Sequence, residues 1–275
     1  MSITAAEVNK LRKQTGAGMM DCKKALQEAE GNMDKAIEIL RLKGQKVAAK
    51  RSDREASEGA ILSGVSTDGK SGVVLSLNCE TDFVAKNEDF IGVAQTLLDL
   101  ALAEGCDNKE SILALSYPGS ELSVADKIVE ETGKIGERIE IGDLQTATGD
   151  SVAAYIHPGN RLATVVGFSG EVNDGVGRDV AMQAAAMAPV AVDQSSIPAD
   201  LIEKEKAIGK DLAIQEGKPA DLAEKIAVGR LNKWYKEVTL VNQPFIKDNK
   251  QTVAQYVAAE CPGAAVSSFS RVALG

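Results

Sequence analysis

Apolar positions recur at helical spacing in the first part of the chain and divide it into short helices. The pattern opens with Thr4-x-x-Glu7, the form of a capping box, in which a hydroxyl and a carboxylate bond free amides at a helix N-terminus. Glycines then break the helical pattern repeatedly. Helices are predicted at residues 4–16, 20–29 and 32–44, the last ending by Gly44. We expect them to form a small module with a thin core, residues 1–45.

The pair Met19-Met20 falls in the first connecting loop of this module. Its side chains have two interpretations. They are either ordinary core residues or an adaptable contact surface, for which the flexible thioether side chain is well suited.

The segment 46–57 interrupts the apolar pattern with charges of both signs, and we interpret it as a solvated linker. A basic arm that binds RNA is the alternative. The positive residues on which that alternative depends are Lys46, Lys50, Arg51 and Arg54.

Short apolar runs after the linker predict a β-hairpin over residues 58–78, with an Asp-Gly turn at Thr67–Lys70. The overlapping segment 64–71 matches the GxxxxGK[ST] pattern of a phosphate-binding loop. Such a loop needs a helix directly after its lysine, whereas the residues after Ser71 are strand-like. A small nucleotide-binding protein that uses Lys70 is therefore kept as an alternative function.

The connection after this hairpin, NCETDFVAKNEDF at 78–90, places an apolar pair between carboxylates. Asn87 is positioned to cap the helix that follows, so Phe83 and Val84 lie in a strand-to-helix loop. Two interpretations are open. Either Phe83 packs under its own loop and Asp82 caps the turn, or the loop presents an aromatic anchor and a carboxylate to a partner.

The hairpin-plus-helix pattern occurs a second time, about 90 residues later. Apolar runs flank the turn His157-Pro158-Gly159-Asn160, and a helix is predicted at 175–187. We infer an α+β fold whose core has two related halves. The first half is 58–150, and the second combines 151–197 with 237–275.

Residues 198–236 carry a near-heptad apolar stripe with charges between the apolar positions. Glu216-Gly217-Lys218-Pro219 interrupts this stripe, so the two arms are predicted to fold back as a protruding antiparallel helical hairpin. Such a hairpin could pack on the core or contact a partner or a second copy of the chain.

Composition narrows the function of this 275-residue chain. The net charge of −9 argues against direct binding to nucleic acid and against binding to an anionic membrane surface. The four cysteines form no CxxC pair and His157 is the lone histidine, so we expect no metal site, no cofactor and no Ser-His-Asp set. No apolar run is long enough to cross a membrane and the N-terminal residues lack a signal-peptide core, so the cytoplasm is the expected compartment.

Several separate motifs occur along the chain. They are TGAGMMDCKKAL at 15–26, TDFVAKN at 81–87, Gly217-Lys218-Pro219 with Glu224-Lys225-Ile226 and Gly229-Arg230, and Gln243-Pro244-Phe245. In this order they resemble bacterial elongation factor Ts, the nucleotide exchange factor of the translational GTPase elongation factor Tu, over the whole chain. Two places depart from the family pattern. Gly142-Asp143 stands where the family often has Arg-Arg, and Met182-Gln183 where many members have Met-His.

The resemblance implies a translation elongation factor and not an enzyme. It implies that an N-terminal ubiquitin-associated-like module docks on the GTPase domain of elongation factor Tu. It also implies that the factor associates with GDP-bound and nucleotide-free elongation factor Tu. In that complex the TDFV loop at 81–84 displaces Mg²⁺ and promotes GDP release, so that GTP can bind. The residues assigned to Mg²⁺ displacement are Thr81, Asp82, Phe83 and Val84. The residues assigned to partner contact are Arg12, Met19, Met20, Asn78 and Cys79. A protein-binding adaptor without exchange activity is the remaining alternative.

Overall fold

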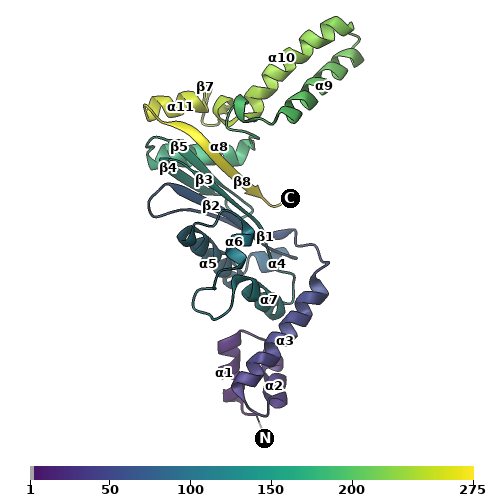
Figure 1. Ribbon diagram of the computed structural model, residues 1–275, viewed down its shortest axis with the longest axis vertical. Coiled ribbons are helices and arrows are strands. Elements are labelled where there is room, and N and C mark those ends of the chain that lie inside the picture. The colour runs from purple at the N-terminus through teal and green to yellow at the C-terminus, as the bar shows by residue number, and fades with distance from the viewer. Residues whose placement is uncertain (1–2) are drawn as a thin grey trace. The chain divides into compact units, whose positions relative to one another are not determined.

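The computed structural model describes residues 3–275 as a mixture of helices and strands, an α+β protein (Figure 1). Contacts divide the chain into two compact units. The first holds the residues up to Leu62, Leu75–Leu144 and Ala273–Gly275, and the second holds Ser63–Val74 and Gln145–Val272. No helix within residues 3–275 is long and apolar enough to cross a lipid bilayer.

Three helices at the start of the first unit pack around a small apolar core. They are α1 (Ala5–Thr15), α2 (Met19–Glu28) and α3 (Met33–Arg51). The predicted capping box is confirmed, because the Glu7 amide donates to Thr4 Oγ1 at 3.3 Å and Glu7 Oε2 accepts the Thr4 amide at 2.7 Å. Fully buried Leu11, Cys22 and Leu26 form the centre of the core.

The predicted end of the third helix at Gly44 is wrong, because α3 continues to Arg51. Gly44 is buried and faces Gly133 of α7 (Val124–Ile135). An ideal Cβ on Gly133 would lie only 2.4 Å from Gly44 Cα. Gly44 therefore serves the close approach of two helices and does not terminate one, and residues 46–51 are helical.

The hairpin predicted at 58–78 is confirmed. It consists of β1 (Glu58–Val65) and β2 (Ser71–Cys79), and β3 (Glu140–Thr148) completes a sheet with the strand order β1-β2-β3. In the turn, Asp68 Oδ1 accepts the Lys70 amide at 3.1 Å. Because a strand begins at Ser71, the helix N-terminus that a phosphate-binding loop requires is absent after Lys70, and the phosphate-binding interpretation is wrong.

Four helices follow β2 in the first unit. They are the single turn α4 (Asp82–Ala85), α5 (Glu88–Glu104), α6 (Lys109–Leu113) and α7. Asn87 caps α5 as predicted, since its side chain accepts the Asp89 amide at 2.8 Å. α5 buries Phe90, Leu97 and Leu98, which anchors the C-terminal end of the connection that carries α4.

The second unit contains a sheet with the strand order β4-β5-β8 and helices against it. Its elements are β4 (Ser151–Ile156), β5 (Leu162–Ser169), α8 (Asp174–Met187), α9 (Ala199–Gln215), α10 (Ala220–Val238), β6 (Pro244–Phe245), β7 (Asp248–Thr252), α11 (Val253–Glu260), β8 (Ala265–Ala273), and the 3₁₀ turns Gln194–Ser196 and Leu240–Asn242. β4 and β5 are antiparallel, with Ser151 opposite Phe168 and Ile156 opposite Ala163. α8 packs on this pair, with Val180 and Phe168 at the core (Figure 1).

Helices α9 and α10 pack along each other in opposite directions (Figure 1). Charged side chains bridge them, because Glu224 near the start of α10 pairs with Lys210 near the end of α9 at 2.9 Å, and Arg230 pairs with Glu216 at 2.7 Å. Small buried residues of α9 and α10, among them Ala213 and Ala227, allow the two helices to approach closely.

Candidate functional site: the loop after strand β2

The connection between β2 and α5 is built around the one-turn helix α4. Thr81 has an extended backbone and its hydroxyl accepts the Val84 amide at 3.5 Å, so Thr81 is the N-cap. Val84 is half-buried and Ala85 is buried, whereas Phe83 between Asp82 and Val84 points outward. The turn is thus anchored through one face and presents the other.

Phe83 is 84% exposed, the largest exposed fraction among the exposed large apolar side chains of residues 3–275. The interpretation in which the ring packs under its own loop is therefore wrong. An aromatic ring in water is unfavourable by itself, so a free ring on a fixed turn is typical of a contact residue.

Asp82 lies beside this ring at the start of α4 and pairs with Lys86 one turn later, Oδ2 to Nζ at 2.6 Å. The hydrogen bond and the charge of Lys86 hold the pKa of Asp82 below its ordinary value. Asp82 is consequently ionised at neutral pH. Thr81, and not Asp82, caps the turn, which corrects the sequence-based alternative.

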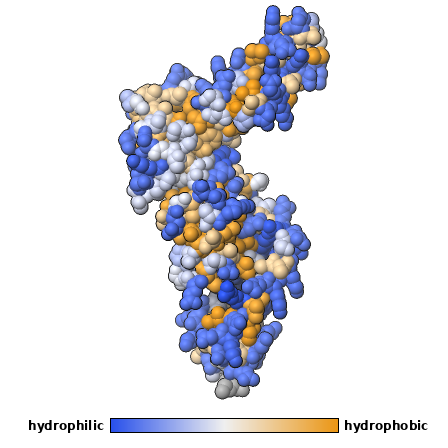
Figure 2. Space-filling view, in the orientation of Figure 1, coloured by the Kyte–Doolittle hydropathy of each residue, from blue (hydrophilic) through white to orange (hydrophobic). Residues whose placement is uncertain are grey.

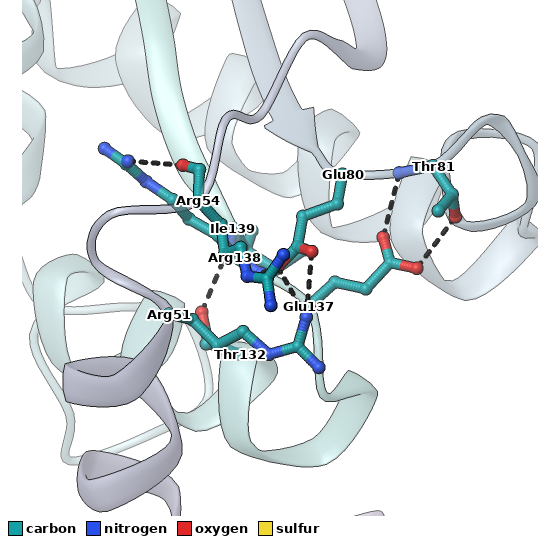
Figure 3. Close-up of polar contacts among 8 residues, drawn as sticks. All are labelled: Arg51, Arg54, Glu80, Thr81, Thr132, Glu137, Arg138 and Ile139. Carbon is teal, nitrogen blue, oxygen red and sulfur yellow. Dashed lines mark hydrogen bonds and ion pairs between the residues drawn. The ribbon is translucent and has the colours of Figure 1, made fainter.

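The base of the loop is fixed by charged residues distant in sequence (Figure 3). Glu137, between α7 and β3, accepts the Thr81 amide at 3.0 Å and the Thr81 hydroxyl at 2.8 Å. Glu80 accepts the Arg138 amide at 2.7 Å and pairs with Arg51 at 2.8 Å. Sequence reasoning missed Glu137 and Arg138 as supports of this loop, because no local motif marks them.

Asn78 and Cys79 at the end of β2 face inward. Cys79 is fully buried and its thiol donates to the Thr81 carbonyl at 3.2 Å. Burial, and secondarily the charge of Glu137, raises the pKa of Cys79 to about 12, so the thiol stays neutral. Asn78 Nδ2 donates to the Ala56 carbonyl at 3.1 Å, while its Oδ1 is buried without a hydrogen-bond partner.

The other expected partner-contact residues lie on the N-terminal helices. Arg12 of α1 is exposed, and Met19 and Met20 are 53% and 63% exposed. The two methionines form the first turn of α2 and not a loop, because the helix starts directly after Gly18. Their exposure rules out the core interpretation and leaves the contact-surface interpretation.

The two positions that depart from the family pattern have structural explanations. Gly142 packs against Asn78, and a Cβ there would lie 2.6 Å from Asn78 Nδ2, so no larger residue fits without movement. Gln183 is fully buried in α8. Its Nε2 donates to Gln243 Oε1 at 3.1 Å and its Oε1 accepts the Ile246 amide at 2.8 Å.

No group of three or more histidine, cysteine, aspartate or glutamate side chains gathers as a metal site within residues 3–275. The loop offers an exposed ring and an ionised carboxylate on a supported turn. This arrangement is suited to contact with another macromolecule.

Comparisons with known proteins agree with this arrangement. The family model described as "Elongation factor TS" matches residues 80–275. The chain is 54% identical to "Elongation factor Ts" of Christiangramia forsetii, with 99% of each chain covered, and 51% identical to that of Flavobacterium psychrophilum, with 100% of this chain and 99% of the relative covered. It is 49% identical to that of Amoebophilus asiaticus over the full length of both. A match over most of the chain together with full-length identities of this size shows that this chain belongs to the elongation factor Ts family.

Proposed function

We propose that this chain associates with elongation factor Tu bound to GDP, displaces Mg²⁺ through the loop Thr81–Val84, and promotes GDP release so that GTP can bind. As a member of its family it is a translation elongation factor and a nucleotide exchange factor for elongation factor Tu. The observation that carries the role of the loop is the 84% exposure of Phe83 on a turn whose base is held by Glu137. We assign this activity to the cytoplasm.

In this proposal Phe83 inserts between helices of the partner's GTPase domain, and Asp82 disturbs the hydrogen bonds near the bound Mg²⁺. The metal neutralises phosphate charge, so its departure weakens the hold on GDP. The factor itself carries out no covalent chemistry and uses no cofactor.

Thermodynamic linkage sets what the factor must do. A GTPase that binds nucleotide at nanomolar strength holds it by about 12 kcal/mol. The factor accelerates release by binding the nucleotide-free state more tightly, and nucleotide rebinding then expels the factor. Burying one phenyl ring contributes only ~2–3 kcal/mol, so association of the factor with its partner requires further contacts.

We assign those contacts to several parts of the chain. Arg12, Met19 and Met20 are the candidates on the N-terminal helices, since their side chains are exposed. Asn78 and Cys79 would contact the partner through their main chain, because their side chains face inward.

The proposed organisation has five parts. They are a ubiquitin-associated-like module at 1–45 whose last helix α3 continues to Arg51, a linker reduced from 46–57 to 52–57, a first core half at 58–150, a related second half at 151–197 with 237–275, and a helical hairpin at 198–236. Repetition of a hairpin followed by a helix, in β1-β2 with α5 and in β4-β5 with α8, supports the relation between the halves.

Self-association through the helical hairpin is a further proposal. Apolar side chains reach its surface (Figure 2), and Ile208, Leu212 and Leu222 are 41%, 44% and 44% exposed. A second copy that packs on these side chains would bury them. Sedimentation velocity over a range of concentrations tests this: a single monomeric species at all concentrations contradicts it.

The exchange mechanism is tested by release of a fluorescent GDP analogue from elongation factor Tu. Phe83→Ala combined with Asp82→Ala is expected to reduce the acceleration roughly 30- to 150-fold, because the ring's burial energy is lost at the step that frees the metal. Val190→Ala, which truncates another exposed apolar side chain, is the control and should leave the rate unchanged. An unchanged rate in the double variant contradicts the mechanism.

Equilibrium dialysis with labelled GDP distinguishes this proposal from a simple adaptor. An exchange factor lowers GDP retention by elongation factor Tu, whereas an adaptor binds the partner without changing nucleotide retention. The chain alone is expected to retain no GDP.

A further inference from the structure

The loop that carries Phe83 begins with an N-cap residue held from outside its own helix. Glu137 accepts both the amide and the hydroxyl of Thr81, at 3.0 and 2.8 Å. The two residues are 56 positions apart in sequence. Figure 3 shows the Glu137 side chain extending from the α7–β3 connection to Thr81.

This pair completes a capping box between two separate segments. In an ordinary capping box the residue three positions after the N-cap is Glu or Gln, and its side chain accepts the N-cap amide. In α4 that position is Val84, which has no polar side chain. Glu137 supplies the missing carboxylate, so the position after Phe83 can remain apolar.

A second hydrogen bond joins the same two segments, with donor and acceptor exchanged. Glu80 Oε1 accepts the Arg138 amide at 2.7 Å, whereas Glu137 accepts the Thr81 amide. Two adjacent residues of one segment are thus bonded to two adjacent residues of the other. Arg51 at the end of α3 reinforces the bond with contacts of 3.0 and 2.8 Å to the two oxygens of Glu80.

Charged acceptors make these bonds strong, because a carboxylate that accepts an N–H or O–H donor forms a shorter and stronger hydrogen bond than a neutral acceptor. The site is also partly shielded, with Glu80 16% exposed at its side chain. The direction in which α4 presents Phe83 therefore depends on bonds made outside the loop.

We propose that Glu137 is a positioning residue for nucleotide exchange, which fixes the orientation of Phe83 and Asp82 through its two hydrogen bonds to Thr81. This inference rests on the proposed role of the loop. A fixed turn avoids the entropy loss of ordering the loop when the ring enters the partner. The maximum rate of GDP release should depend on Glu137. The half-saturating concentration of the factor should depend on it much less, because other parts of the factor contact most of the partner surface.

The test measures GDP release from elongation factor Tu against the concentration of full-length factor. Glu137→Ala is expected to lower the maximum rate about tenfold and to change half-saturation less than about twofold. Glu137→Gln should recover most of the rate, since its amide can accept from the Thr81 N–H and donate to the hydroxyl. Glu104→Ala, an exposed glutamate at the end of α5, is the matched control and should behave as the unmodified protein.

A double-variant cycle provides the second measurement. If Glu137 acts through Thr81, then Thr81→Val combined with Glu137→Ala should be no slower than the slower single variant, within about twofold. Thermal unfolding of each variant separates loss of positioning from loss of fold. Variants that unfold at the temperature of the unmodified protein and yet exchange slowly support the inference.

The outcomes distinguish failure of the positioning inference from failure of the proposed function. If the combined Phe83→Ala and Asp82→Ala changes slow release but Glu137→Ala does not, the positioning inference is overturned while the role of the loop stands. If the combined changes leave release unaffected, the proposed function fails, and slow release by Glu137→Ala alone would then need another cause. Equal loss with Glu137→Gln and Glu137→Ala would also overturn the inference, because the glutamine keeps the hydrogen-bonding geometry.

Discussion

At the scale of single residues, the carboxylates around the loop differ in what they contact. Asp82 pairs with Lys86 in solvent, where an ion pair contributes little to folding, and it stays available to a partner. Glu80 instead accepts the amide of Arg138 and the guanidinium of Arg51 in a partly shielded site. Neighbouring acidic residues thus have separate tasks, one directed outward and one holding the loop base.

The pKa of Glu80 gives a prediction for acid stability. The Arg138 amide, with the hydrogen bond and charge of Arg51, holds this pKa below its ordinary value of 4.5. The carboxylate therefore contributes stability that is present above pH 4.5 and is lost as pH falls through the folded-state pKa. In urea unfolding, Glu80→Gln should be less stable than the unmodified protein at pH 7, and the difference should shrink as pH falls below about 4.5. A difference that stays constant with pH contradicts this assignment.

At the scale of elements, helices α3 and α7 cross where Gly44 meets Gly133. The two glycines are not equivalent. A Cβ on Gly133 would lie 2.4 Å from the Cα of Gly44, whereas a Cβ on Gly44 would lie 3.6 Å from the Cα of Gly133, an ordinary contact. Only one of the two positions therefore requires glycine for steric reasons.

This asymmetry predicts opposite effects of the same substitution. Gly133→Ala should lower the free energy of unfolding by about 1–3 kcal/mol, because the added methyl group collides with the backbone of α3. Gly44→Ala should be neutral or stabilising by up to about 1 kcal/mol, because alanine favours the helix and space exists for its methyl group. Urea denaturation of both variants measures the two values. Equal destabilisation would contradict the crossing geometry.

The elements also show how far sequence reasoning extends. Caps such as Thr4 and Asn87 and the Asp-Gly hairpin are predictable because each depends on residues a few positions apart. Gly44 is not, because glycine both ends helices and permits close packing, and only the identity of the neighbouring helix decides between these roles. The pairing of Glu137 with Thr81 is invisible for the same reason, since the fold brings the two segments together.

The site itself was predictable only in part. The motif around Phe83 located the loop, but both a packed and an exposed ring were compatible with the pattern. Exposure depends on which face of α4 is anchored, and the half-buried Val84 and buried Ala85 decide that. The sequence therefore indicates where the loop lies, and tertiary contacts determine how it is presented.

At the scale of the whole molecule, binding and nucleotide release are expected to depend on different parts. Burying a single ring contributes only ~2–3 kcal/mol, so tight association with the partner must come from other surfaces. Contacts made equally before and after release strengthen association without accelerating release, whereas contacts made only as the metal leaves accelerate it. Exposed methionines on α2 are candidates for the first kind, and Phe83 for the second.

The methionines therefore give a prediction distinct from that for the loop. Met19→Ala combined with Met20→Ala removes two side chains that are 53% and 63% exposed in the free protein, so folding should change little. If the partner buries them, their loss should raise the half-saturating concentration roughly 30- to 1,000-fold, at about 1–2 kcal/mol for each side chain. The maximum rate of GDP release should stay within about twofold, because the loop is unchanged.

Leu42→Ala is the matched control, since Leu42 is a similarly exposed apolar residue of the same helical module, at 51%. It should alter neither half-saturation nor maximum rate. A methionine double variant that lowers the maximum rate as strongly as Phe83→Ala would mean that the module and the loop act as one unit in release. If the methionine variant changes only half-saturation and Phe83→Ala changes only the maximum rate, then α2 supplies affinity and α4 supplies the displacement of the metal. This is the expected result, because α2 and α4 are anchored independently in the first unit.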